Sequence, residues 1–212
     1  MDRNNDKISD LLKELDNIIK SIPPKPEKKA ITGGLLITSD RKREKSSEYT
    51  YEQAMRLVKD GKYSEAIICL EGFLEANPGH GMACNDLGVL YLNEGNKEKA
   101  LYYLKESVVH DPVNLTARKN LGDIYLNLGE LEEGLQIYMK IIEEKPDDIE
   151  ALIKLGEVCE KFERHEGAKL FYKKALKVQP ENGTVKERLK ILSEKNSSRR
   201  NRKKTKRNKK KR

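Results

Sequence analysis

The chain has 212 residues, of which 37% are charged and 36% are apolar. No uncharged run is longer than ten residues, whereas a helix that spans a membrane needs about 20 consecutive apolar residues. The composition therefore excludes a transmembrane helix. The first twenty residues alternate apolar and charged side chains, unlike a cleaved export signal, so we expect a cytoplasmic protein.

The charge separates the chain into three regions. Residues 1–46 carry a net charge of +3, residues 47–182 a net charge of −8, and residues 183–212 a net charge of +13. An acidic centre between two basic ends indicates surfaces with different partners. The three cysteines, Cys69, Cys84 and Cys159, form no CxxC pair. We expect them to be reduced and buried rather than bound to each other or to zinc.

The N-terminal region predicts a short amphipathic helix. Within residues 6–20 the apolar side chains fall on one helical stripe, and they are Ile8, Leu11, Leu12, Leu15, Ile18 and Ile19. We predict this helix over residues 1–22 and a linker rich in Pro and Lys over residues 23–46. The helix could bind a partner, the chain's own repeats or a second copy of the chain, or it could pack as an extra helix on the first repeat. The sequence leaves these alternatives open.

A repeat of 34 residues fills the centre of the chain. Four windows align without a gap, namely 47–80, 81–114, 115–148 and 149–182. Each has a small residue at its eighth and twentieth positions and a proline at its thirty-second. The eighth positions hold Ala54, Gly88, Gly122 and Gly156, and the twentieth hold Ala66, Ala100, Gly134 and Ala168. The pattern predicts two helices in each window, because apolar residues recur at i, i+3, i+4 and i+7. Small residues let the paired helices approach closely, so we predict an all-α fold.

The pattern resembles the tetratricopeptide repeat family. The second window carries the family's signature most clearly, in Leu87, Gly88, Tyr91, Ala100, Leu104 and Pro112. The resemblance implies a right-handed α-solenoid of four antiparallel helix pairs. Some windows depart from the pattern, since Arg118 stands where Trp is commonest and Cys159 replaces the usual Tyr. Residues 183–198 continue as an amphipathic segment, which we predict to be a capping helix over the last apolar face.

The resemblance also implies a binding groove. In the family, certain first-helix positions line a concave surface that binds an extended peptide or a helix. The matching residues here are Asn85, Val89, Asn93, Lys119, Asn120, Asp123, Asn127 and Lys154. A carboxamide both donates and accepts hydrogen bonds, which suits capture of a ligand's backbone. The alternative is that asparagine is simply frequent in this sequence.

The C-terminal tail, residues 199–212, has eleven cations and no apolar residue, so we expect it to be disordered. The cations are Arg199, Arg200, Arg202, Lys203, Lys204, Lys206, Arg207, Lys209, Lys210, Lys211 and Arg212. Such a run makes salt-dependent contacts with nucleic acid, acidic lipid or acidic protein. In a eukaryotic cell it would also direct the protein to the nucleus. The alternative is a solubilising tail that folds against the acidic repeats.

Nothing in the sequence indicates catalysis. His80, His110 and His165 have no spacing that puts two of them on one helix face, and no catalytic motif occurs. We therefore expect no catalytic residue, no metal site and no cofactor.

These observations predict a non-enzymatic adaptor or scaffold that binds a partner's peptide or helix in the groove, with the tail contacting a polyanion. One alternative is a factor associated with nucleic acid or ribosomes through its tail. Another is a scaffold subunit of a large assembly, such as a bacterial motility or secretion apparatus, with self-association through the N-terminal helix.

Overall fold

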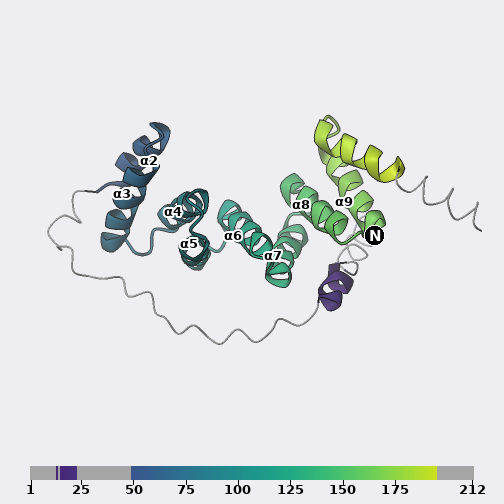
Figure 1. Cartoon of the computed structure of the whole chain (residues 1–212), viewed down its shortest axis with the longest axis horizontal. Coiled ribbons are helices and arrows are strands. Elements are labelled where there is room, and N and C mark those ends of the chain that lie inside the picture. Colours follow the sequence, from purple (N-terminus) through teal and green to yellow (C-terminus); the bar gives the residue numbers. More distant parts are fainter. Residues whose placement is uncertain (1–12, 14, 23–48, 195–212) are drawn as a thin grey trace, which may run out of the picture. The chain divides into compact units, whose positions relative to one another are not determined.

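The computed structural model describes residues 13, 15–22 and 49–194, and these contain helices and turns but no strand. The central helices follow one another in pairs (Figure 1). They are α2 (Tyr51–Lys59), α3 (Tyr63–Ala76), α4 (Gly81–Asn93), α5 (Lys97–His110), α6 (Leu115–Asn127), α7 (Leu131–Glu144), α8 (Ile149–Lys161) and α9 (His165–Val178). A further helix covers residues 183–194, and a short helical segment covers residues 15–21. The all-α solenoid fold class expected from the sequence is confirmed. The predicted linker and the basic tail lie outside the described residues.

The chain forms two compact units. One contains residues 22–137, and the other combines residues 1–21 with residues 138–212. In the first unit α2 packs on α3 and α4 on α5, while α3 contacts α4 and α5 contacts α6. In the second unit α8 packs on α9. These three helix pairs therefore bury their apolar stripes between their own two helices and, in the first unit, also against the next repeat.

Close helix approach explains the small residues at the eighth position. A side chain at Gly88 would place its Cβ 2.7 Å from Leu104 Cγ, and one at Gly156 would place it 2.5 Å from Tyr172 Cε1. Both distances are far below van der Waals contact. Any larger residue would therefore make the neighbouring side chain or the helix that carries it shift.

The turn inside each repeat needs a left-handed residue. Gly61, Gly95 and Gly129 adopt the left-handed backbone conformation, with φ of 73°, 81° and 77°. In the fourth repeat Glu163 takes the same place with φ 56°. Because a Cβ makes this conformation unfavourable, the fourth repeat holds its turn against local strain.

The N-cap of the first helix falls at the same window position in successive repeats. His80 Nδ1 accepts a hydrogen bond from the Ala83 backbone at 3.0 Å, and Asn114 and Asp148 cap α6 and α8 in the same way. Asn182 caps the helix at 183–194. These residues hold the thirty-fourth position of their windows, a periodic signal that the sequence interpretation did not use.

The N-terminal segment belongs to the second unit. Leu15 and Ile18 have no exposed surface, and the Ser21 hydroxyl donates to the Ile18 carbonyl at 2.7 Å. The segment forms one compact unit with residues 138–212 rather than with the first repeat. Among the alternatives left open by the sequence, the structure therefore favours binding to the chain's own repeats.

Candidate functional site

The residues predicted for the groove lie on the first helices of repeats two to four. Asn85, Val89 and Asn93 lie on α4. Lys119, Asn120, Asp123 and Asn127 lie on α6, and Lys154 lies on α8 in the second unit. The helices α4 and α6 contact each other, and the pair Asn85 and Asn120 joins them directly.

A chain of hydrogen bonds runs through this surface. The Tyr51 hydroxyl donates to Asp86 Oδ2 at 2.5 Å, and Asn85 Nδ2 donates to Asp86 Oδ1 at 3.1 Å. Asn120 Nδ2 in turn donates to Asn85 Oδ1 at 2.8 Å. We call these four residues the polar ladder. It joins α2, α4 and α6, the first helices of three successive repeats.

The polar ladder is shielded from water at its centre. Asn85 is only 9% exposed, so its carboxamide depends on protein partners. Burial, followed by the hydrogen bond to Asp86, raises the pKa of Tyr51 well above its usual value. The Tyr51 hydroxyl therefore remains a neutral hydrogen-bond donor.

The sequence interpretation did not include Tyr51 in the site, although a signal for it exists. Both inter-repeat bonds of the polar ladder join residues 35 apart, Tyr51 to Asp86 and Asn85 to Asn120. That spacing joins position five of one window to position six of the next. Complementary polar residues at this spacing would have predicted the contact.

Two other asparagines are placed differently. Asn93 and Asn127 are the last residues of α4 and α6, and both are exposed. Within the part of the chain that the structure describes, neither carboxamide makes a hydrogen bond. The two asparagines hold the same position in two successive repeats. Their hydrogen-bonding groups are therefore repeated along the chain at a spacing of one repeat.

The remaining candidates divide between the two units. Val89 is half-buried on α4, and Lys119 and Asp123 are half-buried on α6. On α8, the distance from Lys154 Nζ to Glu157 Oε2 is 3.8 Å. The structure thus brings most of the predicted residues onto the surface of α4 and α6, while Lys154 has an acidic neighbour in its own unit.

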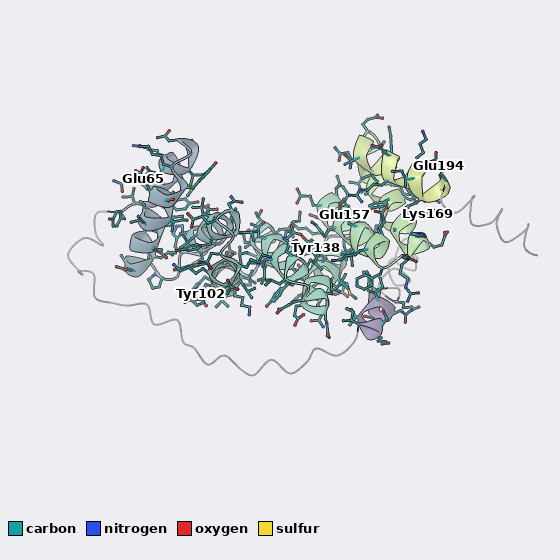
Figure 2. The ribbon with its side chains drawn as sticks, in the orientation of Figure 1. Glu65, Tyr102, Tyr138, Glu157, Lys169 and Glu194 are labelled. Carbon is teal, nitrogen blue, oxygen red and sulfur yellow. The ribbon has the colours of Figure 1, made fainter. Side chains whose placement is uncertain are left out.

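Arginine from the last helix binds the first helix of repeat four. Arg188 donates through Nη2 to Glu157 Oε1 at 2.9 Å and through Nη1 to Glu160 Oε2 at 2.8 Å. We call this group the Arg188 clamp, and Figure 2 labels Glu157 on α8. Arg188 therefore pairs with two carboxylates of α8 at once.

A second polar cluster joins α3, α4 and α5. The Tyr91 hydroxyl donates to Glu71, and Lys99 Nζ donates to the Tyr91 oxygen at 2.7 Å and to Glu71 at 3.2 Å. The Tyr91 ring stacks on Tyr103 with 5.8 Å between centroids. Burial, followed by the bond to Glu71, raises the pKa of Tyr91. These groups hydrogen-bond one another, and the cluster connects helices.

The cysteines and possible metal ligands offer no chemistry in the described residues. Cys69, Cys84 and Cys159 are buried and form no disulfide bond with one another, and burial raises the pKa of the Cys84 thiol to about 11. A thiol with so high a pKa is a poor nucleophile at neutral pH. No His, Cys, Asp and Glu side chains within residues 13, 15–22 and 49–194 gather in a group able to hold a metal ion. In the same residues no helix has the length and apolar character needed to cross a membrane.

Comparison with protein families decides the classification. Three family models, each described as a tetratricopeptide repeat, match residues 51–114, 98–157 and 149–182. Together these matches cover residues 51–182 without a gap. The chain belongs to the tetratricopeptide repeat family. Tetratricopeptide repeats are typically non-catalytic interaction modules, and this tetratricopeptide repeat protein is in general terms a protein-interaction scaffold.

Solved structures share the fold. MamA from Desulfovibrio magneticus RS-1 aligns with a TM-score of 0.64 at 18% identity, over 73% of this chain and 86% of that one. A tetratricopeptide repeat protein from Parabacteroides merdae aligns with a TM-score of 0.64 at 22% identity, over 69% and 59%. PilF from Pseudomonas aeruginosa aligns with a TM-score of 0.62 at 19% identity, over 69% and 67%. At such identities the likeness extends to the fold alone. The search of curated proteins finds no match.

Proposed function

We propose that this tetratricopeptide repeat protein binds an extended peptide or a helix of a partner protein along the surface of α4 and α6. The observation that carries the proposal is the pair Asn93 and Asn127, exposed at equivalent positions of two successive repeats. Each carboxamide offers a donor and an acceptor, the two groups that a peptide bond of the ligand presents. Contact with a ligand backbone would be largely independent of its side chains.

The polar ladder supports this role indirectly. The bond from Asn120 to Asn85 ties α6 to α4, so Asn93 and Asn127 are carried by helices of fixed register. Preorganised groups lose less conformational entropy on binding than groups on mobile elements. We therefore assign Asn85 and Asn120 to positioning the surface, and Asn93, Asn127 and the half-buried Val89 to contacting the ligand.

Charged residues at the edges would set the choice of ligand. Lys119 and Asp123 both lie on α6 and are residues of opposite charge. A surface with both signs selects against a ligand of uniform charge. We propose that these residues act in specificity, with the main affinity supplied by backbone contacts and apolar packing.

The test compares proteins captured from native lysate by the full-length chain and by the double variant Asn93→Ala/Asn127→Ala. We expect the variant to lose the captured partner, because it lacks the two exposed carboxamides. The matched control is Gln136→Ala, which removes an exposed carboxamide from the second helix α7. Circular dichroism checks that each variant remains helical.

Two further arms separate the groove from the tail. Capture is repeated with residues 1–198, and with nuclease at low and high salt. A partner that persists without the tail and after nuclease, but is lost in the double variant, supports the groove. Capture that is unchanged in the double variant contradicts it. Capture that disappears with the tail or with nuclease favours the alternative of a nucleic-acid-associated factor.

A further inference from the structure

The first repeat has an open hollow that none of the residues of α4 lines. The hollow has a volume of about 580 Å³ and lies between α2 and α3. Its lining residues are Tyr49, Gln53, Arg56, Leu57, Glu65, Ile68 and Cys69. Ile68 is 59% exposed, although Ile67 and Cys69 beside it on α3 are 6% and 4% exposed. Figure 2 labels Glu65, one of the lining residues, on α3.

The position of the hollow explains its exposure. In this unit the second helix of a repeat packs on the first helix of the following repeat, as α3 does on α4 and α5 on α6. No described repeat precedes α2 and α3. In the C-terminal unit the last repeat is covered by the helix at 183–194, which buries Val185 and Leu192. A repeat array needs covered faces at both ends, since the end repeats otherwise expose apolar surface.

We propose that residues 31–38 of the same chain cover this hollow. The chain enters the first repeat at Tyr49, which lies at the edge of the hollow. Gly72 fixes that entry point, because a Cβ at Gly72 would lie 2.4 Å from Tyr49 Cδ2. Residues 39–48 connect the segment to Tyr49, and a chain of this length spans at most about 35 Å. Closing so short a loop loses little entropy, so the local segment has an advantage over a separate molecule.

The composition of the segment matches the hollow. Residues 30–39 are uncharged and include Ile31, Leu35, Leu36 and Ile37, while basic residues stand on both sides. The hollow presents Ile68, Leu57 and the Tyr49 ring. Bringing two apolar surfaces of one chain together removes both from water. The charged flanks would remain outside in solvent.

The consequence is an array whose N-terminal face is occupied by its own chain. Such a face cannot stack against another molecule. The inference does not depend on the proposed groove. It concerns a different surface and has a separate readout.

The experiment places a photoreactive benzoylphenylalanine at Ile68 in the full-length protein. Cross-linked peptides are then identified by mass spectrometry in a mixture of isotope-labelled and unlabelled chains. We expect Ile68 to cross-link to residues 31–38 within a single chain. We also expect this product to be lost in the variant Leu35→Ser/Leu36→Ser/Ile37→Ser.

The matched control places the same probe at Leu170, an apolar residue of α9 that is 37% exposed. It should give no cross-link to residues 31–38. Absence of the segment from the Ile68 products overturns the proposal. A product that joins labelled to unlabelled chains also overturns it, in favour of a second copy as occupant, and a product with another protein overturns it in favour of an external partner.

Discussion

The two compact units join neighbouring helices by different chemistry. In residues 22–137 the polar ladder connects three first helices through hydrogen bonds, with Asn85 only 9% exposed at its centre. In the second unit the Arg188 clamp connects the last helix to α8 through ion pairs. Its side chains are 35% exposed at Arg188, 34% at Glu157 and 24% at Glu160.

The difference in exposure implies a difference in role. A buried carboxamide must keep its partners, because an unsatisfied buried polar group lowers stability by about 1–3 kcal/mol. The polar ladder therefore fixes the register of the repeats that carry it. Partly exposed ion pairs are screened by salt and contribute less to the free energy of unfolding. The Arg188 clamp attaches the helix at 183–194 to α8, and the stability of this attachment depends on the salt concentration.

The largest expected effect tests the close helix contact at a glycine, which both units share. Gly88→Val and Gly156→Val each place a branched side chain where helices touch, against Leu104 and Tyr172. We expect each to lower the free energy of unfolding by about 1–3 kcal/mol, the usual range for overpacking. Urea denaturation followed by circular dichroism measures the loss. At Gly183 a Cβ meets nothing within 4 Å, so a loss of similar size in Gly183→Val would contradict close packing as the cause.

The second prediction concerns the polar ladder. Asn85→Ala removes the acceptor of Asn120 and a donor to Asp86, and we expect a loss of about 1–3 kcal/mol in the free energy of unfolding. The exposed Asn93→Ala should change it by less than about 0.5 kcal/mol. Urea denaturation of both variants gives the comparison. Equal values would mean that the polar ladder does not stabilise the unit.

A third, smaller effect compares the turns of the repeats. Glu163→Gly should raise the free energy of unfolding by about 0.5–1 kcal/mol, because it relieves the left-handed strain at φ 56°. The reciprocal change Gly95→Ala, at φ 81°, should lower it by about 1 kcal/mol. Thermal denaturation of the two variants checks the opposite signs. A destabilising Glu163→Gly would show that the glutamate side chain outweighs the strain.

The smallest effect sharpens the contrast with the Arg188 clamp. Arg188→Gln removes both ion pairs, and we expect a loss of about 0.2–1 kcal/mol at low salt. The loss should shrink near 1 M salt, where the Debye length is about 3 Å. Denaturation at two salt concentrations measures it, and the effect of Asn85→Ala should stay constant. A salt-independent loss at Arg188 would indicate that packing, rather than charge, holds the end helix.

Much of the fold was predictable because it repeats. The helix pairs follow from apolar spacing, and the close contacts at Gly88 and Gly156 follow from the small residues at one position of each window. The turn was less predictable, since Glu163 adopts a conformation that the other repeats assign to glycine. There the packing of the surrounding repeat overrides the local preference.

The sequence predicted the positions of the candidate site residues but did not distinguish their structural roles. Four asparagines at equivalent or nearly equivalent positions gave equal reason to expect ligand contacts. Only the structure separates the Asn85 and Asn120 pair, which bond to each other, from Asn93 and Asn127, which remain exposed. The basic tail lies outside the described residues, and its contact with a polyanion stays a prediction.

The amino-acid sequence by itself determined the period, the helix pairs, the family and the candidate surface, because each depends on residue types at regular spacing within about 34 residues. The tertiary structure alone decided which polar groups pair across repeats and which unit buries Leu15 and Ile18. Those outcomes depend on side chains far apart in the chain that meet only after the helices pack. Local pattern cannot specify such contacts, since the same asparagine can bond to a neighbouring repeat or remain free for a ligand.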